Sequence, residues 1–395
     1  MTPRRVLIIG AGYGGMAAAV RLQKHHIPFT LVNKHDYHYF KTLLHEAAGG
    51  RQDVQTYAIA LTDVLDQPTS TVVKDVVTAI DYENAQVRGE HSSYSYDTLI
   101  VALGSQTSYF DIPGLHEHGL VLNSLEGAKR IREHIEHTFL AYQTQHDASM
   151  LRVVIGGGGL TGVELAGELA DYLPHLLKRY KIPVNDYELA LVHAHDEILP
   201  GVDEQLRKVA AEKLAARGVK LVLGRHVIAA SDGSISLTGG LTMETRTFIW
   251  TGGVEASPLV RASRFSVDSR GRARVDAYLQ SEDDPRVYII GDAARFESPA
   301  GEVLPPTGQV AEQMGDHAAR NLIHLLHNET MEPFEFHNRG LVASLGPKYG
   351  VAEVGHHHAR GLAALMLKDG SKMKYLMHLG GPQVLFEKRK QWIEI

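Results

Sequence analysis

The sequence has no cysteine among its 395 residues. A chain without thiols forms no disulfide, carries no redox-active dithiol, and provides no thiolate for zinc or an iron–sulfur cluster. Enzymes that work through a redox-active disulfide or a catalytic thiol are therefore excluded as a class. Any redox chemistry in this protein must come from a bound organic cofactor.

Two other features are missing. No apolar run reaches the roughly 18 residues that a transmembrane helix needs, and no signal peptide precedes the first predicted strand. The formal net charge of −6 argues against a nucleic-acid binder, because phosphate binding requires a basic surface. No metal site is predicted, since the one tight histidine run, 356–358, has no carboxylates at suitable spacing. We expect a soluble or peripheral protein of two or three domains.

What the sequence does have is a strand–turn–helix unit at its start. The apolar run 4–9 leads into glycines at 10, 12 and 15, and the helical stretch 16–22 follows. In this order, Gly10 permits the tight turn, Gly12 lets the backbone approach a pyrophosphate, and Gly15 allows close helix packing. The unit predicts a dinucleotide site at the N-terminus of the helix. The next strand, 29–33, ends in Asn33 and Lys34, where an acidic ribose ligand is usual.

A second unit of the same kind spans 152–164, with glycines at 157, 159 and 162. Glu164 follows in the first turn of the helix, where it either complements the helix dipole or serves the reaction. Glu168, one turn later, is either a partner of Glu164 or a solvated helix residue, and the second interpretation is favoured. The following strand, 188–193, ends in His193 where an acid that binds a ribose hydroxyl is usual. Discrimination against a ribose 2′-phosphate is therefore expected to be weak, unless a neighbour such as His195 or Asp196 takes the role of the acid. Protonation of His193 near pH 6.5 should weaken this discrimination further, because a positive ring attracts a phosphate.

Later segments add candidate site residues. The strand within 286–294 delivers Gly291 and Asp292 at its carboxyl end, where ligands bind in open α/β sheets. A helix is predicted over 308–326, with Gln309 and Gln313 one turn apart on one face. These two glutamines are either polar residues on a solvent-exposed helix or amide donors to the carbonyl group of a bound ligand. Strand-like segments are expected at 334–345 and 351–354.

The residue pattern from Leu362 onward predicts an amphipathic C-terminal tail. Basic residues alternate there with Leu, Met and Trp, which suits a helix lying on anionic lipid. A dimerisation helix or a core-capping helix is the alternative. The residues concerned are Lys368, Lys372, Lys374, Lys388, Arg389, Lys390 and Trp392.

These motifs together resemble the bacterial type II NADH dehydrogenases, single-subunit NADH:quinone oxidoreductases of the two-dinucleotide-binding flavoprotein superfamily. Further resembling stretches are 101–105, 250–254, 305–313, 336–340 and 379–382. The resemblance implies FAD and NADH, with NADPH possible, as cofactor and electron donor. It implies FAD contacts at Gly10, Gly12, Gly14, Gly15, Asn33, Lys34, His45, Ala102, Gly104, Asp292 and Gln309. It implies NAD(P)H contacts at Gly157, Gly159, Leu160, Thr161, Gly162, Glu164, His193 and Gly252.

The expected fold is α/β, with two Rossmann-like domains, the second inserted in the first, and a small C-terminal domain. The predicted limits are 1–115 and 255–330 for FAD, 116–254 for NAD(P)H, and 331–395 for membrane association or dimerisation. The resemblance implies catalytic roles for Glu164, Gln309 and Gln313, with a quinone as acceptor. It also implies a homodimer, held peripherally at the cytoplasmic face of the cell membrane.

Two other functions remain open from the sequence. One is a soluble NAD(P)H-dependent reductase of a small electron carrier. The other is a flavin-bearing redox sensor without turnover. The basic tail favours the quinone reductase over both.

Overall fold

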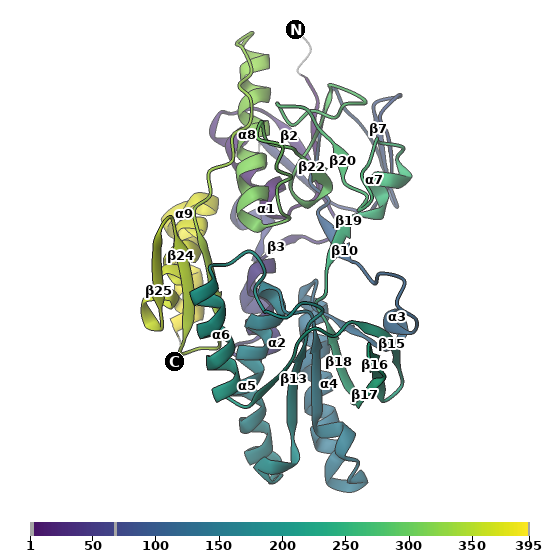
Figure 1. Cartoon of the computed structure of the whole chain (residues 1–395). Coiled ribbons are helices and arrows are strands. Elements are labelled where there is room, and N and C mark those ends of the chain that lie inside the picture. The colour runs from purple at the N-terminus through teal and green to yellow at the C-terminus, as the bar shows by residue number, and fades with distance from the viewer. Residues whose placement is uncertain (1–3, 67–68, 394–395) are drawn as a thin grey trace.

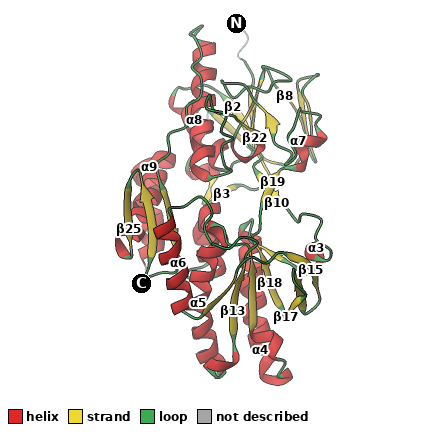
Figure 2. Cartoon of the chain, viewed as in Figure 1, coloured by secondary structure: helices red, strands yellow, loops and turns green. Residues whose placement is uncertain are grey.

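The computed structural model describes residues 4–66 and 69–393. Two parallel five-stranded sheets dominate it, one above the other in Figure 1, with the C-terminal part packed beside them. Helices flank both sheets (Figure 2), so the central strands are buried on both faces and are almost wholly apolar, whereas the edge strands β5 (Ser70–Lys74), β11 (Leu120–Val121) and β14 (Val219–Val222) are partly exposed. The expected α/β fold with two Rossmann-like sheets is confirmed.

The first sheet has the strand order β21-β9-β1-β2-β5. Its strands come from both ends of the sequence, because the second sheet is built from the residues between β9 and β21. They are β1 (Val6–Ile9), β2 (Phe29–Asn33), β5 (Ser70–Lys74), β9 (Thr98–Val101) and β21 (Val287–Ile289). Helices α1 (Tyr13–Lys24) and α8 (Gly308–Leu326) pack on each other beside it.

The second sheet has the order β11-β18-β12-β13-β14 and repeats this arrangement. Its strands are β11 (Leu120–Val121), β12 (Arg152–Gly156), β13 (Glu188–Val192), β14 (Val219–Val222) and β18 (Thr247–Trp250). Its helices are α4 (Leu125–Gln145), α5 (Leu160–Tyr180) and α6 (Glu204–Ala216). A short antiparallel pair, β10 (Ser105–Thr107) with β19 (Val254–Ala256), connects the two halves. The domain limits themselves stay a prediction.

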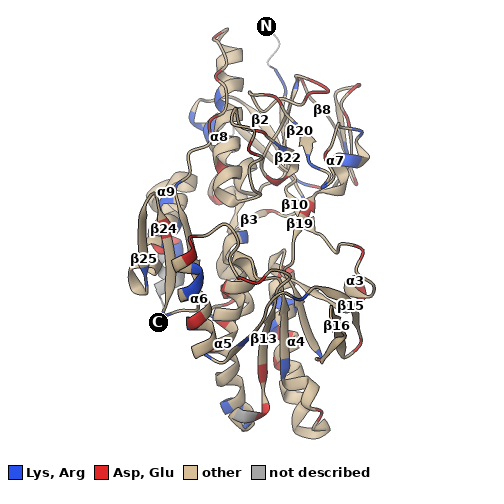
Figure 3. Cartoon of the chain, viewed as in Figure 1, with Lys and Arg blue, Asp and Glu red and all other residues tan. Residues whose placement is uncertain are grey.

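Three-stranded antiparallel sheets complete the two halves and the C-terminal part. Two of them are β6 (Val77–Asp81), β7 (Gln86–Gly89) with β8 (Ser93–Ser95), and β15 (Val227–Ser231), β16 (Ser234–Leu237) with β17 (Leu241–Glu244). The third consists of β23 (Leu341–Ser344), β24 (Gly350–Val354) and β25 (His357–Arg360), and it packs against α9 (Leu362–Ile393). Charges of both signs are interspersed over these elements (Figure 3).

Helix α9 is two helical pieces joined at a kink. Gly380 and Gly381 leave helical geometry, and Pro382 begins the second piece. No described helix is both long enough and apolar enough to cross a membrane. The side chains of Arg389, Lys390 and Trp392 lie outside those that the structure describes.

The strand expected over 334–345 forms only at its end, as β23. Residues 332–340 instead lie along α8, where side-chain amides of that helix hydrogen-bond to their backbone. Asn321 pairs with Glu332, Gln313 with His337, and Gln309 with Arg339 and Gly340. Because these backbone groups are already satisfied, the segment needs no neighbouring strand.

Candidate active site

The two glycine turns have the same geometry. Gly10 and Gly157 both have positive φ, 97° and 116°. A Cβ on Gly15 would lie 1.9 Å from the Gly10 carbonyl oxygen, and one on Gly162 would lie 1.9 Å from that of Gly157. Only glycine fits at these positions, because each turn must close tightly against the start of its helix.

The middle glycine of each turn is different, because it faces open space. A Cβ on Gly12 or Gly159 would meet no described atom within 4 Å. Each of these glycines is the N-cap of its helix, α1 or α5, and no described side chain caps it. Each turn thus offers unpaired N–H groups and a helix dipole beside an open volume, which suits a pyrophosphate. Leu160 and Thr161 form the first turn of α5.

Other predicted cofactor residues line the first turn. Asn33 Oδ1 accepts from the Ala11 N–H at 3.0 Å. Ala102 packs against the turn, since its carbonyl oxygen lies 2.4 Å from the Cβ that Gly10 lacks, and Gly104, with φ of 66°, faces open space. Lys34 is exposed. Gly14 faces away from the turn, because a Cβ there would lie 3.0 Å from the Ala311 carbonyl oxygen of α8.

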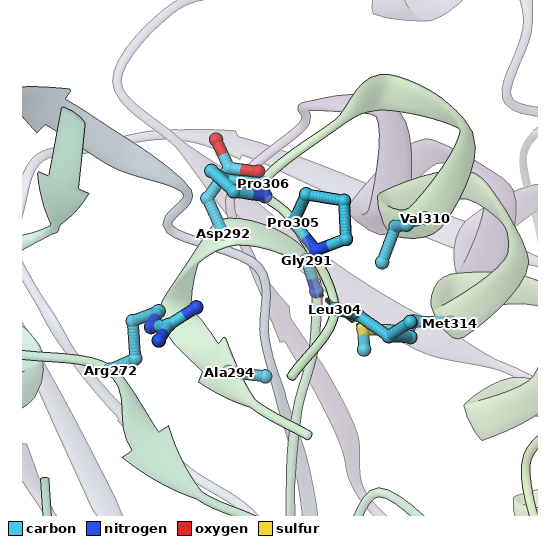
Figure 4. Close-up of a pocket in the computed structure, with 9 residues that line it drawn as sticks. All are labelled: Arg272, Gly291, Asp292, Ala294, Leu304, Pro305, Pro306, Val310 and Met314. Carbon is cyan, nitrogen blue, oxygen red and sulfur yellow. Dashed lines mark hydrogen bonds between the residues drawn. The ribbon is translucent and has the colours of Figure 1, made fainter. Parts of the chain in front are cut away.

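Asp292 lies at the carboxyl end of the first sheet, as predicted. Ser105 Oγ donates to Asp292 Oδ2 at 2.6 Å, and Lys41 Nζ lies 3.7 Å from the same oxygen. Figure 4 shows Asp292 beside Pro305 and Pro306 at a small pocket, with Val310 and Met314 of α8 on its other side. A hydroxyl and an ammonium fix this carboxylate where a ligand across the sheet edge would meet it.

Glu164 lies beyond the first turn of α5, not in it as expected, and is buried at the junction of both halves with the C-terminal part. Its Oε1 accepts from Lys368 Nζ of α9 at 2.6 Å and from the backbone N–H of Ser344 at 3.0 Å. The Lys368 ammonium also reaches Ser344 Oγ at 2.6 Å and His45 Nε2 at 3.0 Å. The carboxylate therefore faces a buried cation contributed by the last helix.

His45 lies in this cluster too, on α2 (Leu44–Ala48). Burial, with the Lys368, Arg51 and Lys372 cations nearby, holds the pKa of His45 well below its usual value. The ring is therefore neutral at physiological pH, with Nε2 as acceptor for Lys368 and the proton on Nδ1. That nitrogen faces Glu164 Oε2 at 3.4 Å.

A second group of charges lies next to the first. Lys372, one turn after Lys368, donates to Glu46 Oε1 at 3.0 Å, and Arg51 bridges Glu46 and Glu168. Burial raises the pKa of Glu168 to about 7, with Arg51 opposing the shift and Glu46 adding to it. Although burial alone would raise it, Lys372 and Arg51 lower the pKa of Glu46. Three carboxylates and three cations are thus gathered in one buried region.

Two sequence interpretations are wrong here. Glu168 is not a solvated helix residue, because only 3% of it is exposed and it is paired with Arg51. Lys368 and Lys372 do not face a lipid surface, because their side chains are 12% and 14% exposed and paired with Glu164 and Glu46. In both cases the partner is remote in sequence.

Gln309 and Gln313 share a face of α8, as predicted, but their amides have partners. Gln313 exchanges two hydrogen bonds of 3.0 Å with His337, and Gln309 bonds Gly340 at 3.2 Å and Arg339 at 3.1 Å. Either amide would have to share or release a backbone partner to bind a quinone carbonyl. Their role as quinone ligands stays a prediction.

His193 lies against the second glycine turn. Its Nδ1 accepts from the Gly158 N–H at 3.0 Å, and its buried Nε2 has no hydrogen-bond partner among the described residues. Burial, with His195 and His226 nearby, lowers the pKa of His193 below its usual 6.5. Gly252 closes the same turn, because its N–H lies 2.8 Å from where a Gly157 Cβ would be.

The residues that sequence reasoning missed are the partners of the predicted ones. Ser344, Glu46 and Arg51 carry no motif that marks them. Lys368 and Lys372 do have a signal, since lysines four residues apart lie on one face of a helix and can meet carboxylates of the same neighbouring region. Their partners, Glu164 and Glu46, could not be named from the sequence.

The described residues fit two dinucleotides. Each turn presents an open cradle that a Cβ would fill, at the N-terminus of a helix of 12 or 21 residues. Asn33 binds the first turn and His193 binds the second. Asp292 lies at the carboxyl end of the first sheet, and Glu164 follows the second turn by two residues. The described residues contain no group of three or more His, Cys, Asp or Glu arranged for a metal ion.

Comparison with known proteins agrees with this geometry. Residues 4–315 match the family model described as pyridine nucleotide-disulphide oxidoreductase. The chain is 32% identical to the type II NADH:quinone oxidoreductase of Staphylococcus saprophyticus and 33% identical to that of Staphylococcus aureus, covering 98% of each chain.

Two solved structures share the fold. NDH2 of Plasmodium falciparum, solved with NADH, superposes with a TM-score of 0.90 at 18% identity, over 99% of this chain and 98% of that one. The sulfide:quinone oxidoreductase of Aquifex aeolicus has a TM-score of 0.78 at 17% identity, over 98% and 92%. Fold, paired cradles and near-complete alignment with curated relatives agree, and the chain belongs to the type II NADH:quinone oxidoreductase family.

Proposed function

We propose that this protein oxidises NADH and reduces a quinone by two electrons, without pumping protons. The observation that carries the proposal is the pair of equivalent open glycine turns, one on each sheet, with the buried Glu164–Lys368 pair at the junction of the two halves. Two cradles provide for a resident FAD and for a nicotinamide donor. The absence of cysteine leaves the flavin as the redox centre.

The first cradle would hold FAD through the N–H groups of its turn, with Asn33 and Asp292 at its sides. When bound, FAD supplies the redox chemistry, taking a hydride from NADH and passing two electrons to the quinone. The overall reaction converts NADH, a proton and a quinone into NAD⁺ and a quinol. The hydride carries one proton, so the second must come from water.

The chain's own groups can handle that proton. Lys368 holds an ammonium 2.6 Å from Glu164 Oε1, and Ser344 and His45 complete the coordination of the two charges. Only 7% of Glu164 is exposed, so bulk water is largely excluded from this carboxylate. We assign Glu164 the role of orienting the donor or relaying a proton.

Membrane association is proposed for the outer face of α9. Six large apolar side chains there are 44–74% exposed: Leu362, Met366, Leu367, Met373, Met377 and Phe386. A lipid surface is the favoured occupant, because the proposed acceptor is a quinone dissolved in the membrane. Attachment at the cytoplasmic face and a homodimer remain further predictions.

The test is a stopped-flow experiment on the purified protein. NADH should bleach the flavin, and a water-soluble quinone should then restore its absorbance over repeated turnovers. A flavin that NADH bleaches but that no quinone reoxidises would favour a reductase of a small electron carrier, provided that such a carrier restores it. Bleaching without turnover on any acceptor would favour the redox sensor.

A further inference from the structure

The two peptides that flank the Ala11 Cα are held by side chains: Asn33 binds the Gly10–Ala11 peptide, and His38, backed by Tyr375, binds the Ala11–Gly12 peptide. The Ala11 N–H donates to Asn33 Oδ1 at 3.0 Å, and the Ala11 carbonyl lies 2.8 Å from His38 Nδ1. His38 Nε2 in turn lies 3.0 Å from the hydroxyl of Tyr375 on α9. His38 and Tyr375 are 1% and 7% exposed, so water does not compete for these bonds.

The chemistry of the partners determines which group donates and which accepts in each of the hydrogen bonds that link Ala11, His38 and Tyr375. A carbonyl only accepts, so His38 Nδ1 must carry the proton. Burial lowers the pKa of His38 to about 4, so the ring is neutral and Nε2 is an acceptor. Tyr375 must then donate its hydroxyl hydrogen to Nε2. The Ala11 carbonyl therefore sets the tautomer, and the Tyr375 hydroxyl supports it by satisfying the Nε2 acceptor.

The consequence for the glycine turn follows from peptide geometry. In a planar trans peptide the carbonyl and the following N–H point in opposite directions. A hydrogen bond that draws the Ala11 carbonyl toward His38 therefore turns the Gly12 N–H away from it. Gly12 is the position whose missing Cβ leaves open space.

Packing supports the same arrangement. The Tyr13 ring, directly after the turn, lies 4.8 Å from the Tyr375 ring and 5.5 Å from the His38 ring, centroid to centroid. Phe40 also contacts both His38 and Tyr375. The hydrogen-bonded chain is enclosed by aromatic rings and cannot easily rearrange.

We propose that Tyr375 and His38 are positioning residues for FAD: together they hold the Ala11–Gly12 peptide so that the Gly12 N–H points toward the pyrophosphate. Neither side chain need touch the cofactor. The C-terminal helix thereby contributes to cofactor retention at a turn more than 360 residues earlier in the sequence. This inference rests on the proposed binding of FAD.

The test measures FAD release from the full-length, flavin-loaded protein, followed by the flavin fluorescence that appears on dissociation. Tyr375→Phe removes only the hydroxyl and should speed release by about fivefold, the effect of one neutral hydrogen bond. His38→Leu should speed release by more, since the Ala11 carbonyl then has no donor. His38→Asn places an amide N–H close to the position of Nδ1 and should release FAD more slowly than His38→Leu.

The matched control is Tyr96→Phe. Tyr96 is 1% exposed and its hydroxyl has no hydrogen-bond partner among the described residues, so its loss should leave FAD release unchanged. The thermal midpoint of the FAD-free protein measures the general loss of stability, which should be small in Tyr375→Phe, because only one hydrogen bond is removed, and too small to account for the faster FAD release.

The inference would be overturned if Tyr375→Phe released FAD at the wild-type rate, or if His38→Leu and His38→Asn released FAD at equal rates. A lowered midpoint of the FAD-free Tyr375→Phe protein with unchanged release would do the same. If Tyr375→Phe does not fold, the comparison of FAD release from His38→Leu and His38→Asn tests the inference alone. A wild-type protein that binds no FAD would instead contradict the proposed function.

Discussion

Gly12 and Gly15 lie in the same turn but differ in what a side chain would meet. Gly12 has φ of −75°, which any residue adopts, and faces open space. Gly12→Val should fold with a nearly unchanged thermal midpoint and lose most of its flavin, because the side chain would fill the proposed pyrophosphate volume. Flavin absorbance of the purified protein measures this.

The companion variant is Gly15→Val, whose Cβ would lie 1.9 Å from the Gly10 carbonyl oxygen. It should fail to fold or melt far below wild type. A Gly12→Val protein with full flavin content would contradict the FAD assignment.

His193 gives a prediction about the electron donor. An acid at this position would accept from the ribose hydroxyl of NADH and repel the 2′-phosphate of NADPH, and a neutral histidine supplies no repulsion. His193→Glu should therefore raise the NADH-over-NADPH ratio of kcat/KM, by roughly tenfold if the missing interaction is about 1.4 kcal/mol.

The pH dependence of this ratio differs from the sequence-based expectation. Because the pKa of His193 lies below 6.5, the ring is neutral throughout the neutral range. The wild-type ratio should be flat above pH 6.5 and fall only below it, where a protonated ring attracts the phosphate. A large, pH-independent preference for NADH in the wild type would contradict this role.

Glu168 links stability to pH. Its pKa of about 7 exceeds the ordinary carboxyl value of 4.5, so the folded protein binds this proton more tightly than the unfolded chain. The contribution of Glu168 is complete below pH 4.5 and is lost as the pH rises through 7. The difference in unfolding free energy between wild type and Glu168→Gln should fall by up to about 3 kcal/mol over this window.

Urea denaturation at several pH values measures that difference. Glu133→Gln is the control, because its side chain is 66% exposed and should show no such slope. A pH-independent difference for Glu168→Gln would mean that Glu168 stays ionised in the folded protein.

At the scale of elements, the amide side chains of α8 are the feature to test. Gln309→Ala and Gln313→Ala each remove hydrogen bonds worth about 0.5–1.5 kcal/mol and loosen residues 337–340. If this face serves the quinone, either change should slow flavin reoxidation by quinone severalfold and leave flavin reduction by NADH unchanged. Stopped-flow measurement of the two half-reactions separates these effects.

Asn321→Ala is the matched control on the same helix, since Asn321 bonds Glu332 in the same manner. It should lower the thermal midpoint and leave both half-reactions intact. Equal slowing of both half-reactions in the glutamine variants would indicate a purely structural role.

The elements that could be predicted are those whose hydrogen bonds are local or repetitive. The helix expected over 308–326 is α8 to the residue, because Thr307 caps it and its apolar face is regular. The prediction of one strand over 334–345 was wrong for all but its end, β23, because side chains of α8 satisfy the backbone of the preceding residues. The pattern of apolar residues does not indicate such a partner. Glycine spacing located both turns, since their conformation is a local property.

At the scale of the whole molecule, α9 is tested for membrane binding. Met366→Glu places a charge on a side chain that is 74% exposed and should weaken sedimentation with phosphatidylglycerol-containing vesicles. Lys374 is exposed, whereas Lys368 and Lys372 are largely buried in ion pairs, so these two described lysines should add little salt dependence to the binding. Val184→Glu, at a site 66% exposed on the second half, is the control.

Light scattering distinguishes the other occupant of this face. If α9 joins two copies, Met366→Glu should produce monomers and leave vesicle binding intact, which would contradict the membrane proposal. Truncation after Gly361 is not an equivalent test, because it also removes Lys368, Lys372 and Tyr375.

The candidate site was predictable in part. Glu164 could be singled out because it follows a glycine turn, whereas Lys368 lies 204 residues away and its pairing depends on how the C-terminal part docks. His38 and Tyr375 are separated by 337 residues and share no pattern. Contacts between remote segments are set by the packing of the whole chain, and one sequence read alone does not specify them.

The position of α9 in the chain has a consequence for biosynthesis. A ribosome releases the N-terminal glycine turn first and α9 only after every strand of both sheets. Until then Glu164 lacks its lysine and His38 lacks its tyrosine. Nascent chains stalled before α9 should therefore hold FAD weakly, and cofactor loading becomes a late step of maturation.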